Sequence, residues 1–319
     1  MPSWTMHVLT DTLERICLPD ELADSKSLVT IGAFDGIHLG HQHLIGRLIA
    51  QARTQNHLAG LVTFYPHPTT VLSPRHTLPY LTTPGEKTIL LEQLGLDWIA
   101  ILSFDRQLAA LTPRTFVQHL YQRLNMRGLY VSDDFALGRD RTGDVSALQT
   151  LGQEMGFDVY ITPFLQDDGL KIGSSRIRTL LRHGHVRKAA SLLGRHYALA
   201  GEVVHGAQRG RCIGFPTANL QVSPERVIPA NGIYATYATL GTERYCAVTS
   251  IGTRPTFDNG EQSVEAYILD FNQDVYGCDL VLEFVARLRP ELRFSSVQKL
   301  VDQINQDVLD AKAIFAQHT

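Results

Sequence analysis

Two histidines in a glycine-rich stretch are the first residues whose types and spacing suggest chemistry. The stretch GAFDGIHLGH runs from Gly32 to His41, with its three glycines four residues apart. Glycines let a phosphate approach the backbone closely, and the N-terminus of a helix attracts anions. His38 and His41 are three apart, so on a forming helix they share a face and can donate to charge developing on a phosphoryl oxygen. The stretch therefore predicts transfer of a nucleotidyl group.

Other readings of this stretch stay open. It matches neither GxGxxG nor GxxxxGK[ST], so the usual dinucleotide fold and the Walker loop are poor fits. His38, His41 and His43 would also suit a metal cluster, although carboxylates or thiols that would complete one are not evident nearby in the sequence. A third reading is a turn with surface histidines.

A second motif, IGSSRIR, spans Ile172–Arg178 and predicts the start of a helix with Ser174 or Ser175 as its N-cap. Arg176 then lies in the first turn, where a guanidinium can hold a β- or γ-phosphate with two hydrogen bonds. Alone, the motif favours an ordinary capped helix with exposed arginines. Together with HLGH it is more specific.

The segment GFPTAN places Thr217 and Asn219 two residues apart, so on an extended chain they point the same way. A hydroxyl and an amide oxygen, completed by ATP phosphates and water, suit Mg²⁺, which usually takes few protein ligands. An ordinary proline-containing turn is the alternative.

Glu265 lies in SVEAYILDF, where strand alternation puts it on the face of Tyr267, Leu269 and Phe271. A carboxylate on an apolar face is costly unless it has a function, and a desolvated carboxylate is a better general base. An exposed strand end is the alternative.

The helices and strands that carry these residues follow two sequence patterns, one in each half of the chain. In the first, strands and helices alternate and the strands are almost continuously apolar, which predicts a parallel sheet covered on both faces, a doubly wound α/β domain. Ligands of such domains lie beyond the carboxyl ends of the strands. We expect strands at Leu28–Ile31, Leu58–Phe64, Trp98–Phe104, Gly128–Ser132 and Phe157–Thr162, and helices at Gln42–Gln55, Glu86–Leu94, Pro113–Leu124 and Val145–Met155.

The second pattern of secondary structure begins after two helical stretches, Ser175–Leu181 and Val186–Leu193. From Tyr197 to Leu288, short β-like runs are separated by glycines, which predicts an antiparallel barrel or sandwich. The tail Ser295–Phe315 has helical apolar spacing and is expected to pack on it. The change of rhythm places a domain boundary near Gly184, with domains at 1–184 and 185–319.

Bulk properties narrow the class of protein. The 319 residues suggest about two domains. With 44% hydrophobic and 19% charged residues and a net charge of -3, the chain is typical of globular proteins and unlike a general nucleic-acid binder. The four widely spaced cysteines predict free thiols in a reducing cytoplasm. We find neither a signal-peptide core nor an apolar run of membrane-spanning length, and expect no membrane partner.

At this point the sequence resembles a known family. HLGH followed by SSRIR looks like the nucleotidylyltransferase superfamily, and FDGIHLGHQ, TFYPHP, LTTPGEK, DDFALGR and SSRIR occur in the order seen in bifunctional bacterial riboflavin kinase/FMN adenylyltransferases, also called FAD synthetases. The second half is similar to the kinase module of that family through VVHGAQRGRCIGFPTANL, PANGIYA, SIGTRPTF and VEAYILDF. The resemblance implies a six-stranded antiparallel barrel with a C-terminal helix after the α/β domain.

The resemblance also implies two reactions. Riboflavin and ATP would give FMN in the second domain, with Glu265 as base on the ribityl 5′-hydroxyl and Mg²⁺ at Thr217 and Asn219. FMN and ATP would then give FAD and pyrophosphate in the first domain, with His38, His41 and Arg176 as catalytic residues. Flavins are thus substrates and products. Nucleotide- or flavin-binding roles are expected for Gly32, Phe34, Asp35, Gly40, Asp134, Phe135, Ser174, Ser175, Gly214, Pro216 and Gly252.

The chain departs from the family pattern at several positions. Ala33 stands where the family usually has Asn, Tyr65 where it has an acidic residue, and Gly173 where it has a serine. LRPELRF, with Pro290 and Leu292, replaces a more polar segment. Two other functions stay open: a nucleotidylyltransferase that acts on another phosphate, and a flavin sensor without turnover. The sequence makes no prediction of oligomeric state.

Overall fold

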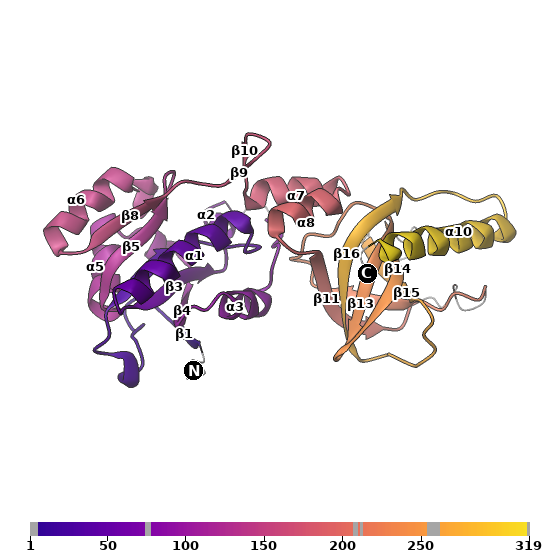
Figure 1. Ribbon diagram of the computed structural model, residues 1–319, viewed down its shortest axis with the longest axis horizontal. Coiled ribbons are helices and arrows are strands. Elements are labelled where there is room, and N and C mark those ends of the chain that lie inside the picture. The colour runs from indigo at the N-terminus through magenta and orange to yellow at the C-terminus, as the bar shows by residue number, and fades with distance from the viewer. Residues whose placement is uncertain (1–5, 74–77, 207–209, 211–212, 254–261, 318–319) are drawn as a thin grey trace. The chain divides into compact units, whose positions relative to one another are not determined.

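The computed structural model describes residues 6–73, 78–206, 210, 213–253 and 262–317. The chain divides into two compact units, Met1–Ile172 and Gly173–Thr319. In Figure 1 the first unit runs from indigo to magenta and the second continues to yellow.

The first unit is built on a sheet of six strands in the order β1-β4-β3-β2-β5-β8. Every neighbouring pair is parallel, as expected from the alternation of strands and helices. The strands are β1 (His7–Asp11), β2 (Ser27–Ile31), β3 (Leu58–Tyr65), β4 (Trp98–Ser103), β5 (Met126–Ser132) and β8 (Asp158–Thr162). Short hairpins add β6 (Ala136–Leu137) with β7 (Gly143–Asp144), and β9 (Gln166–Asp167) with β10 (Leu170–Lys171).

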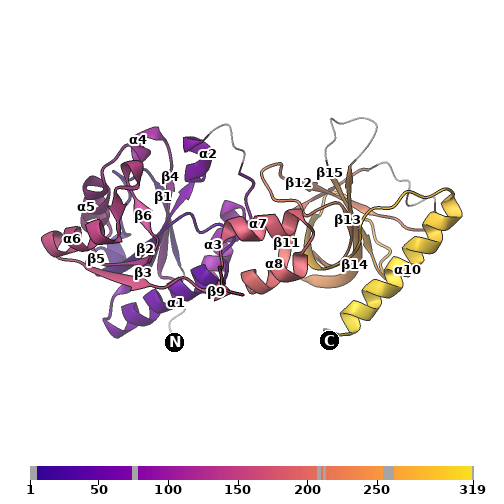
Figure 2. The same cartoon turned by 90° about the horizontal axis from the view of Figure 1, so that it is seen from above.

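Helices cover both faces of this sheet (Figures 1 and 2), so the doubly wound prediction is confirmed. Successive β2 residues serve opposite faces: Leu28 packs in the cluster with α1 and α3, and Val29 in the cluster with α5 and α6. The helices are α1 (Leu39–Thr54), α2 (Pro68–Leu72), α3 (Pro84–Gln93), α4 (Arg106–Ala109), α5 (Pro113–Arg123) and α6 (Val145–Met155), with 3-10 turns at Asp20–Leu22 and Arg139–Arg141.

Strand β1 was not predicted from the sequence. Its residues HVLTD are mostly exposed or half-buried, and it lies at an edge of the sheet, parallel to β4. A short edge strand does not need the continuous apolar run that identifies a buried one.

Trp98 begins β4 and is completely buried in the first unit. Gly60 on the neighbouring strand β3 pairs with it, and a Cβ added at Gly60 would overlap the indole ring. Glycine is therefore required at this strand position because the ring occupies the space of a side chain.

The second unit is a closed antiparallel barrel in the order β11-β12-β15-β14-β13-β16. This arrangement confirms the six-stranded barrel that the resemblance implied. Tyr234 and Phe284 fill its interior edge to face, with their ring centroids 5.3 Å apart. The strands are β11 (Tyr197–Val204), β12 (Ala218–Val222), β13 (Gly232–Leu240), β14 (Glu243–Thr253), β15 (Gln262–Ile268) and β16 (Asp279–Arg289).

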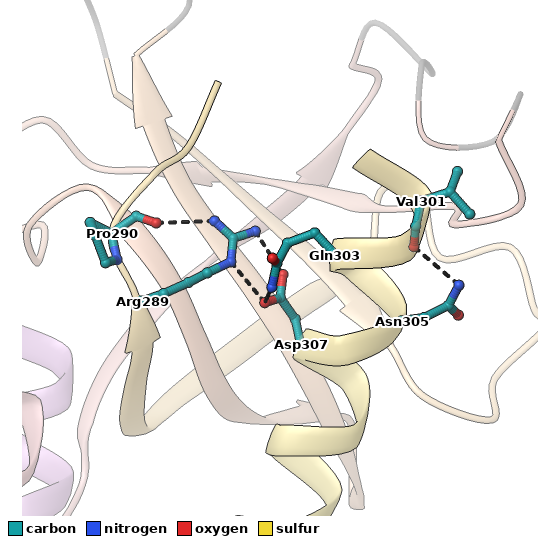
Figure 3. A network of polar contacts seen from close by, with 6 residues as sticks. All are labelled: Arg289, Pro290, Val301, Gln303, Asn305 and Asp307. Atoms are coloured by element: carbon teal, nitrogen blue, oxygen red, sulfur yellow. Dashed lines mark hydrogen bonds and ion pairs between the residues drawn. The ribbon is translucent and has the colours of Figure 1, made fainter. Parts of the chain in front are cut away.

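The C-terminal helix α10 (Val297–Ala316) packs on the outside of the barrel, as expected, through Ala311 and Phe315. Arg289 at the end of β16 forms a two-point ion pair with the buried Asp307, with nitrogen–oxygen distances of 2.8 and 2.7 Å (Figure 3). Gln303 also donates to Asp307 and Arg289 to the Pro290 carbonyl, so the pair is hydrogen-bonded on both sides.

Helices α7 (Ser174–Arg182) and α8 (Val186–Leu193) belong to the second unit. Sequence rhythm placed the boundary near Gly184, whereas the compact units divide after Ile172. The physical reason lies at the end of α7: the Leu181 carbonyl accepts from Ala230 N at 3.0 Å, and Arg287 donates to the His183 carbonyl at 3.5 Å. These bonds join α7 to the barrel.

Candidate active sites

The histidine loop (residues 32–38) follows β2 directly and leads into α1. His38 is buried and caps the helix: its Nδ1 accepts from His41 N at 3.3 Å. A ring nitrogen that accepts is unprotonated, so in neutral His38 the proton is on Nε2. The cap therefore fixes His38 as a donor at Nε2. Sequence reasoning did not foresee histidine as the cap, because Ser, Thr, Asp and Asn are the preferred residues there.

The structure brings His38 and His41 together. Their rings stack with centroids 3.6 Å apart and an interplanar angle of 17°. Burial lowers the pKa of His41 well below its usual value, and the nearby His38, Lys87 and Lys171 lower it further. Within the described residues, His41 Nδ1 is buried without a hydrogen-bond partner. His41 is thus a neutral imidazole at pH 7.

Glycines and Phe34 shape the same loop. Phe34 is buried with φ 46°, and its ring meets His41 edge to face at 5.0 Å. A Cβ at Gly32 would approach that ring to 3.1 Å, and one at Gly40 would lie 3.2 Å from the His38 ring and 3.4 Å from the Ile172 carbonyl. The predicted residues Gly32, Phe34 and Gly40 therefore gather around the two histidines.

Asp35 is buried and joins the histidine loop to the support segment, residues 80–87. Its carboxylate accepts from the backbone N–H groups of Leu81 and Thr82 at 3.0 and 3.1 Å. Thr82 Oγ1 in turn accepts from Gly36 N at 3.1 Å. These contacts of Asp35 hold the loop, and its predicted contact with a nucleotide stays a prediction.

Lys87 lies at the end of the support segment, on α3, and sequence reasoning assigned it no role. It is buried, and its Nζ donates to the Ala33 carbonyl at 2.7 Å and to Thr63 Oγ1 at 3.2 Å. Its presence in the motif LTTPGEK was the available signal. Nothing in a one-dimensional pattern places that lysine under the histidine loop.

Asp134 and Phe135 follow β5 at the carboxyl end of the sheet. Phe135 packs against the core. Asp134 is exposed, forms an ion pair with Lys171 and accepts from Ser132 Oγ at 2.9 Å. Burial raises the Asp134 pKa, but the bonds from Lys171 and Ser132 outweigh it and hold that pKa below its usual value.

Ser174 and Arg176 lie in the first turn of α7, both half-buried, and Ser175 is exposed. The predicted cap at Ser174 or Ser175 is wrong: Gly173 is the N-cap, without a side-chain bond, and Ser174 is the first helical residue. Arg176 was correctly placed in the first turn. The cap moves by one residue because Gly173 itself adopts the extended backbone of an N-cap.

The barrel brings the neighbouring residues Thr217 and Asn219 together with Glu265, which lies 48 residues after Thr217. Asn219 on β12 is the register partner of Glu265 on β15, and Thr217 Oγ1 donates to Glu265 Oε2 at 3.3 Å. Three oxygen-bearing side chains therefore meet, from β15, from β12 and from the residue directly before β12.

The face on which Glu265 lies is only partly as predicted. Val264, Ala266 and Ile268 are buried, whereas Glu265 and Tyr267 are half-buried and share the outward face of β15. Leu269 and Phe271 do not continue this face because the strand ends at Ile268. Leu269 instead packs in the cluster with α10.

An aromatic contact covers part of that face, with Phe215 and Tyr267 edge to face at 5.3 Å. Gly206 leaves room for the Asn219 side chain, because a Cβ at position 206 would overlap the Asn219 amide. Gly206 was not among the predicted site residues, although VVHG ends in a glycine just after a strand.

The remaining predicted glycines and proline of this unit are more dispersed. Gly214 and Pro216 are exposed before β12, and Gly214 has φ 89°. Gly252 on β14 leaves room for the Glu291 carboxylate, which also accepts from Asn231 at 3.0 Å. Arg254–Thr256 of SIGTRPTF, Phe257 and Cys212 lie outside the described residues.

The described residues contain neither a ready-made metal cluster nor a membrane-spanning helix. There, no group of three or more His, Cys, Asp or Glu side chains is placed to hold a metal ion. Among the same residues, no helix has both the length and the apolar character needed to cross a bilayer. Cys17, Cys246 and Cys278 are free thiols.

Comparisons with known proteins divide the chain in the same order. A family model described as FAD synthetase matches residues 20–176, and one described as riboflavin kinase matches residues 193–315. A bifunctional riboflavin kinase/FMN adenylyltransferase of Escherichia coli (strain K12) is 37% identical over 290 residues, 90% of this chain and 92% of that protein. The protein of the same description from Bacillus subtilis (strain 168) is 36% identical over 298 residues, 92% and 93% of the two chains.

A solved structure also matches over almost the whole chain. It is described as a macrolide-efflux protein from Streptococcus pneumoniae, with TM-score 0.89 and 33% identity over 96% of this chain and 99% of that one. Together with the family models, which supply the order of the two domains, the full-length relatives are decisive: the chain belongs to the family of bifunctional riboflavin kinase/FMN adenylyltransferases, transferases with an N-terminal FAD synthetase domain and a C-terminal riboflavin kinase domain.

Proposed function

We propose that Glu265 is the general base of riboflavin phosphorylation and that His38 and His41 stabilise the transition state of FMN adenylylation. The observation that carries the first assignment is the meeting of Glu265 on β15 with Asn219 on β12 and with Thr217, which directly precedes β12. The second rests on the stacked histidines at the start of α1, with the Nε2 proton of His38 fixed by its cap.

In the kinase reaction, Glu265 takes the proton of the ribityl 5′-hydroxyl as that oxygen attacks the γ-phosphorus of ATP. The bond from the γ-phosphorus to its bridging oxygen breaks, and ADP leaves. Glu265 is half-buried and shares its strand face with Tyr267, which packs against Phe215. A base within hydrogen-bond reach of its proton typically contributes about 10²–10⁴-fold to the rate.

The donor set beside Glu265 fits Mg²⁺. Thr217 and Asn219 offer neutral oxygens, which Mg²⁺ accepts when substrate phosphates and water complete its shell. Thr217 and Asn219 would hold the ion, which when bound neutralises phosphate charge as the phosphoryl group moves. Thr217 also donates to Glu265, and this bond orients the carboxylate.

In the adenylylation reaction, an oxygen of the FMN phosphate attacks the α-phosphorus of ATP and pyrophosphate leaves. His38 donates from Nε2 to a phosphate oxygen, and the neutral His41 donates similarly without the charge of an imidazolium. The predicted contacts of Ser174, Ser175 and Arg176 with the ATP phosphates rest on the family motif, which the FAD synthetase model includes as far as Arg176.

Other predictions are part of this proposal without a further observation. They are the flavin or nucleotide contacts of Asp134, Phe135, Gly214, Pro216 and Gly252, and location in the cytoplasm. The proposed partners are riboflavin, FMN and ATP, without nucleic acid or membrane.

The test is a time course with the purified chain, riboflavin, ATP and Mg²⁺, in which riboflavin, FMN and FAD are separated chromatographically. We expect FMN first and FAD later. A parallel reaction that starts from FMN and ATP measures adenylylation alone. FMN that accumulates without FAD would contradict the first-unit assignment, and bound flavin without any product would contradict both.

A further inference from the structure

Lys87 is a buried cation beneath the histidine loop. Two of its three N–H donors are accounted for by the Ala33 carbonyl at 2.7 Å and Thr63 Oγ1 at 3.2 Å. Thr63 Oγ1 also donates to the Ala33 carbonyl, at 3.1 Å. Ala33 precedes Phe34, whose φ is 46°, so the ammonium holds the backbone where the chain turns from β2 toward α1.

Burial makes the positive charge of Lys87 energetically unfavourable. Burial lowers its pKa to about 8, against the opposing field of Asp35. The Asp35 carboxylate is bonded to the Leu81 and Thr82 backbone, and no ion pair of Lys87 is found in the described ranges. An unpaired buried cation destabilises a fold relative to an apolar side chain of similar volume.

The groups that face Lys87 are those of the proposed adenylylation site. Asp35 faces Lys87 from the histidine loop. The field of Lys87 reaches His41, next to His38, and helps to keep the His41 imidazole neutral. A cation here also adds positive potential under the place where phosphates would collect. Both effects bear on the histidines and neither requires contact with substrate.

We infer that Lys87 is a positioning residue for adenylyl transfer: its ammonium holds the Ala33 carbonyl, which fixes the histidine loop and thereby aims His38 and His41. The inference rests on the proposed role of those histidines. Thr63 shares the acceptor, so the loop is not expected to unfold without Lys87; it loses the cation and one of two bonds to Ala33.

The pH dependence of this role has a definite sign. The ammonium form does the positioning, so adenylylation falls as pH rises through about 8. The contribution of Lys87 to stability changes in the opposite direction. Because its pKa is lowered in the folded state, that state binds fewer protons than the unfolded state between pH 8 or so and the ordinary lysine pKa. In this pH window, the free energy of unfolding therefore rises with pH. A loss of rate above pH 8 is therefore not a loss of folding caused by Lys87.

The experiment compares Lys87→Met, Lys87→Arg and the unchanged full-length chain in FMN adenylylation and riboflavin phosphorylation, each measured across pH. Lys26→Met on the exposed surface of the same unit is the matched control. We expect Lys87→Met to lower kcat of adenylylation about 10- to 100-fold, to abolish the fall above pH 8, and to leave phosphorylation unchanged. Lys87→Arg keeps a charge that does not titrate, so it should recover part of the rate and hold it at alkaline pH.

The outcomes separate the two proposals. If the unchanged chain makes no FAD from FMN, the proposed function fails. If it makes FAD and Lys87→Met keeps the same kcat and the same alkaline fall, the positioning role is wrong. A variant that loses rate, keeps that fall and melts at lower temperature would make Lys87 structural only. Should Lys87→Met not fold, the unchanged chain still decides: a fall above pH 8 in adenylylation, absent from phosphorylation, supports the role, and its absence overturns it.

Discussion

The two proposed sites are held in place by different means. In the first unit, His38 and His41 lie on a loop and a helix start, which Asp35, Thr82 and Lys87 fasten to a segment about fifty residues further along the chain. In the second unit, strand register brings Asn219 opposite Glu265. A site built on side-chain bonds responds to substitutions at a distance, whereas a site built on register responds mainly to changes in its own residues.

The largest effect is expected at Glu265, and it tests most directly whether the two sites are separate. Glu265→Gln keeps the shape but removes the base, so riboflavin phosphorylation should fall about 10²–10⁴-fold, while FMN adenylylation stays within about twofold. Rates with riboflavin and with FMN as the starting flavin measure the two activities. Glu202→Gln on β11 is the control, an exposed strand glutamate that should change neither. Equal loss of both activities in a folded Glu265→Gln protein would refute two separate sites.

The reverse experiment changes the histidines. His38→Asn keeps an acceptor for the His41 N–H, because Asn is a good N-cap, and His41→Ala removes the second imidazole. Together they should lower adenylylation about 10²–10³-fold and leave FMN as the end product from riboflavin. His119→Asn, on a helix that packs on the other face of the sheet, should have no effect. FAD output that survives the double change would exclude the phosphate role.

A smaller effect is expected at the metal position. Thr217→Val preserves the volume but removes the hydroxyl that donates to Glu265. The kinase reaction should then need about tenfold more Mg²⁺ for half-maximal rate, with adenylylation unchanged. Thr239→Val on β13 is the control. An unchanged Mg²⁺ titration would remove Thr217 from the proposed metal ligands.

The smallest effect is expected at Gly40, and Gly46 on the same helix serves as its comparison. Gly40→Ala puts a Cβ 3.2 Å from the His38 ring, so adenylylation should fall about two- to tenfold as the ring shifts. Gly46 has open space around it, and Gly46→Ala should raise the free energy of unfolding by about 0.5–1 kcal/mol without loss of rate. Denaturant melts and FMN-dependent rates give both values. Similar rates for the two variants would show that the His38 position is not critical.

Sequence alone predicted most of the fold, and it failed where contacts are distant. The buried strands of the first sheet, such as β3, were found because their apolar runs are continuous. The membership of α7 in the second unit was missed, since it depends on Arg287 and Ala230 from the barrel. No period in the sequence encodes those bonds.

The same limit applies to the candidate sites. The spacing of His38 and His41 indicated their shared face, because that is a local property of a helix. The bond of Thr217 to Glu265 and the approach of Lys87 to Ala33 span 48 and 54 residues. Only the fold could bring those partners together.

The burial of Trp98 also gives the first unit a spectroscopic signature that the second unit lacks. The chain has two tryptophans, Trp4 and Trp98, and neither lies in residues 173–319. Because Trp98 is shielded from water against Gly60, its emission should lie at short wavelength in the folded chain and shift to longer wavelength only when the first unit opens. Tyrosines and secondary structure occur in both units, so a change in the tyrosine or far-ultraviolet signal without a shift of the Trp98 emission reports the barrel. A single denaturation series that follows both signals can thus distinguish the unfolding of the two halves of one bifunctional enzyme.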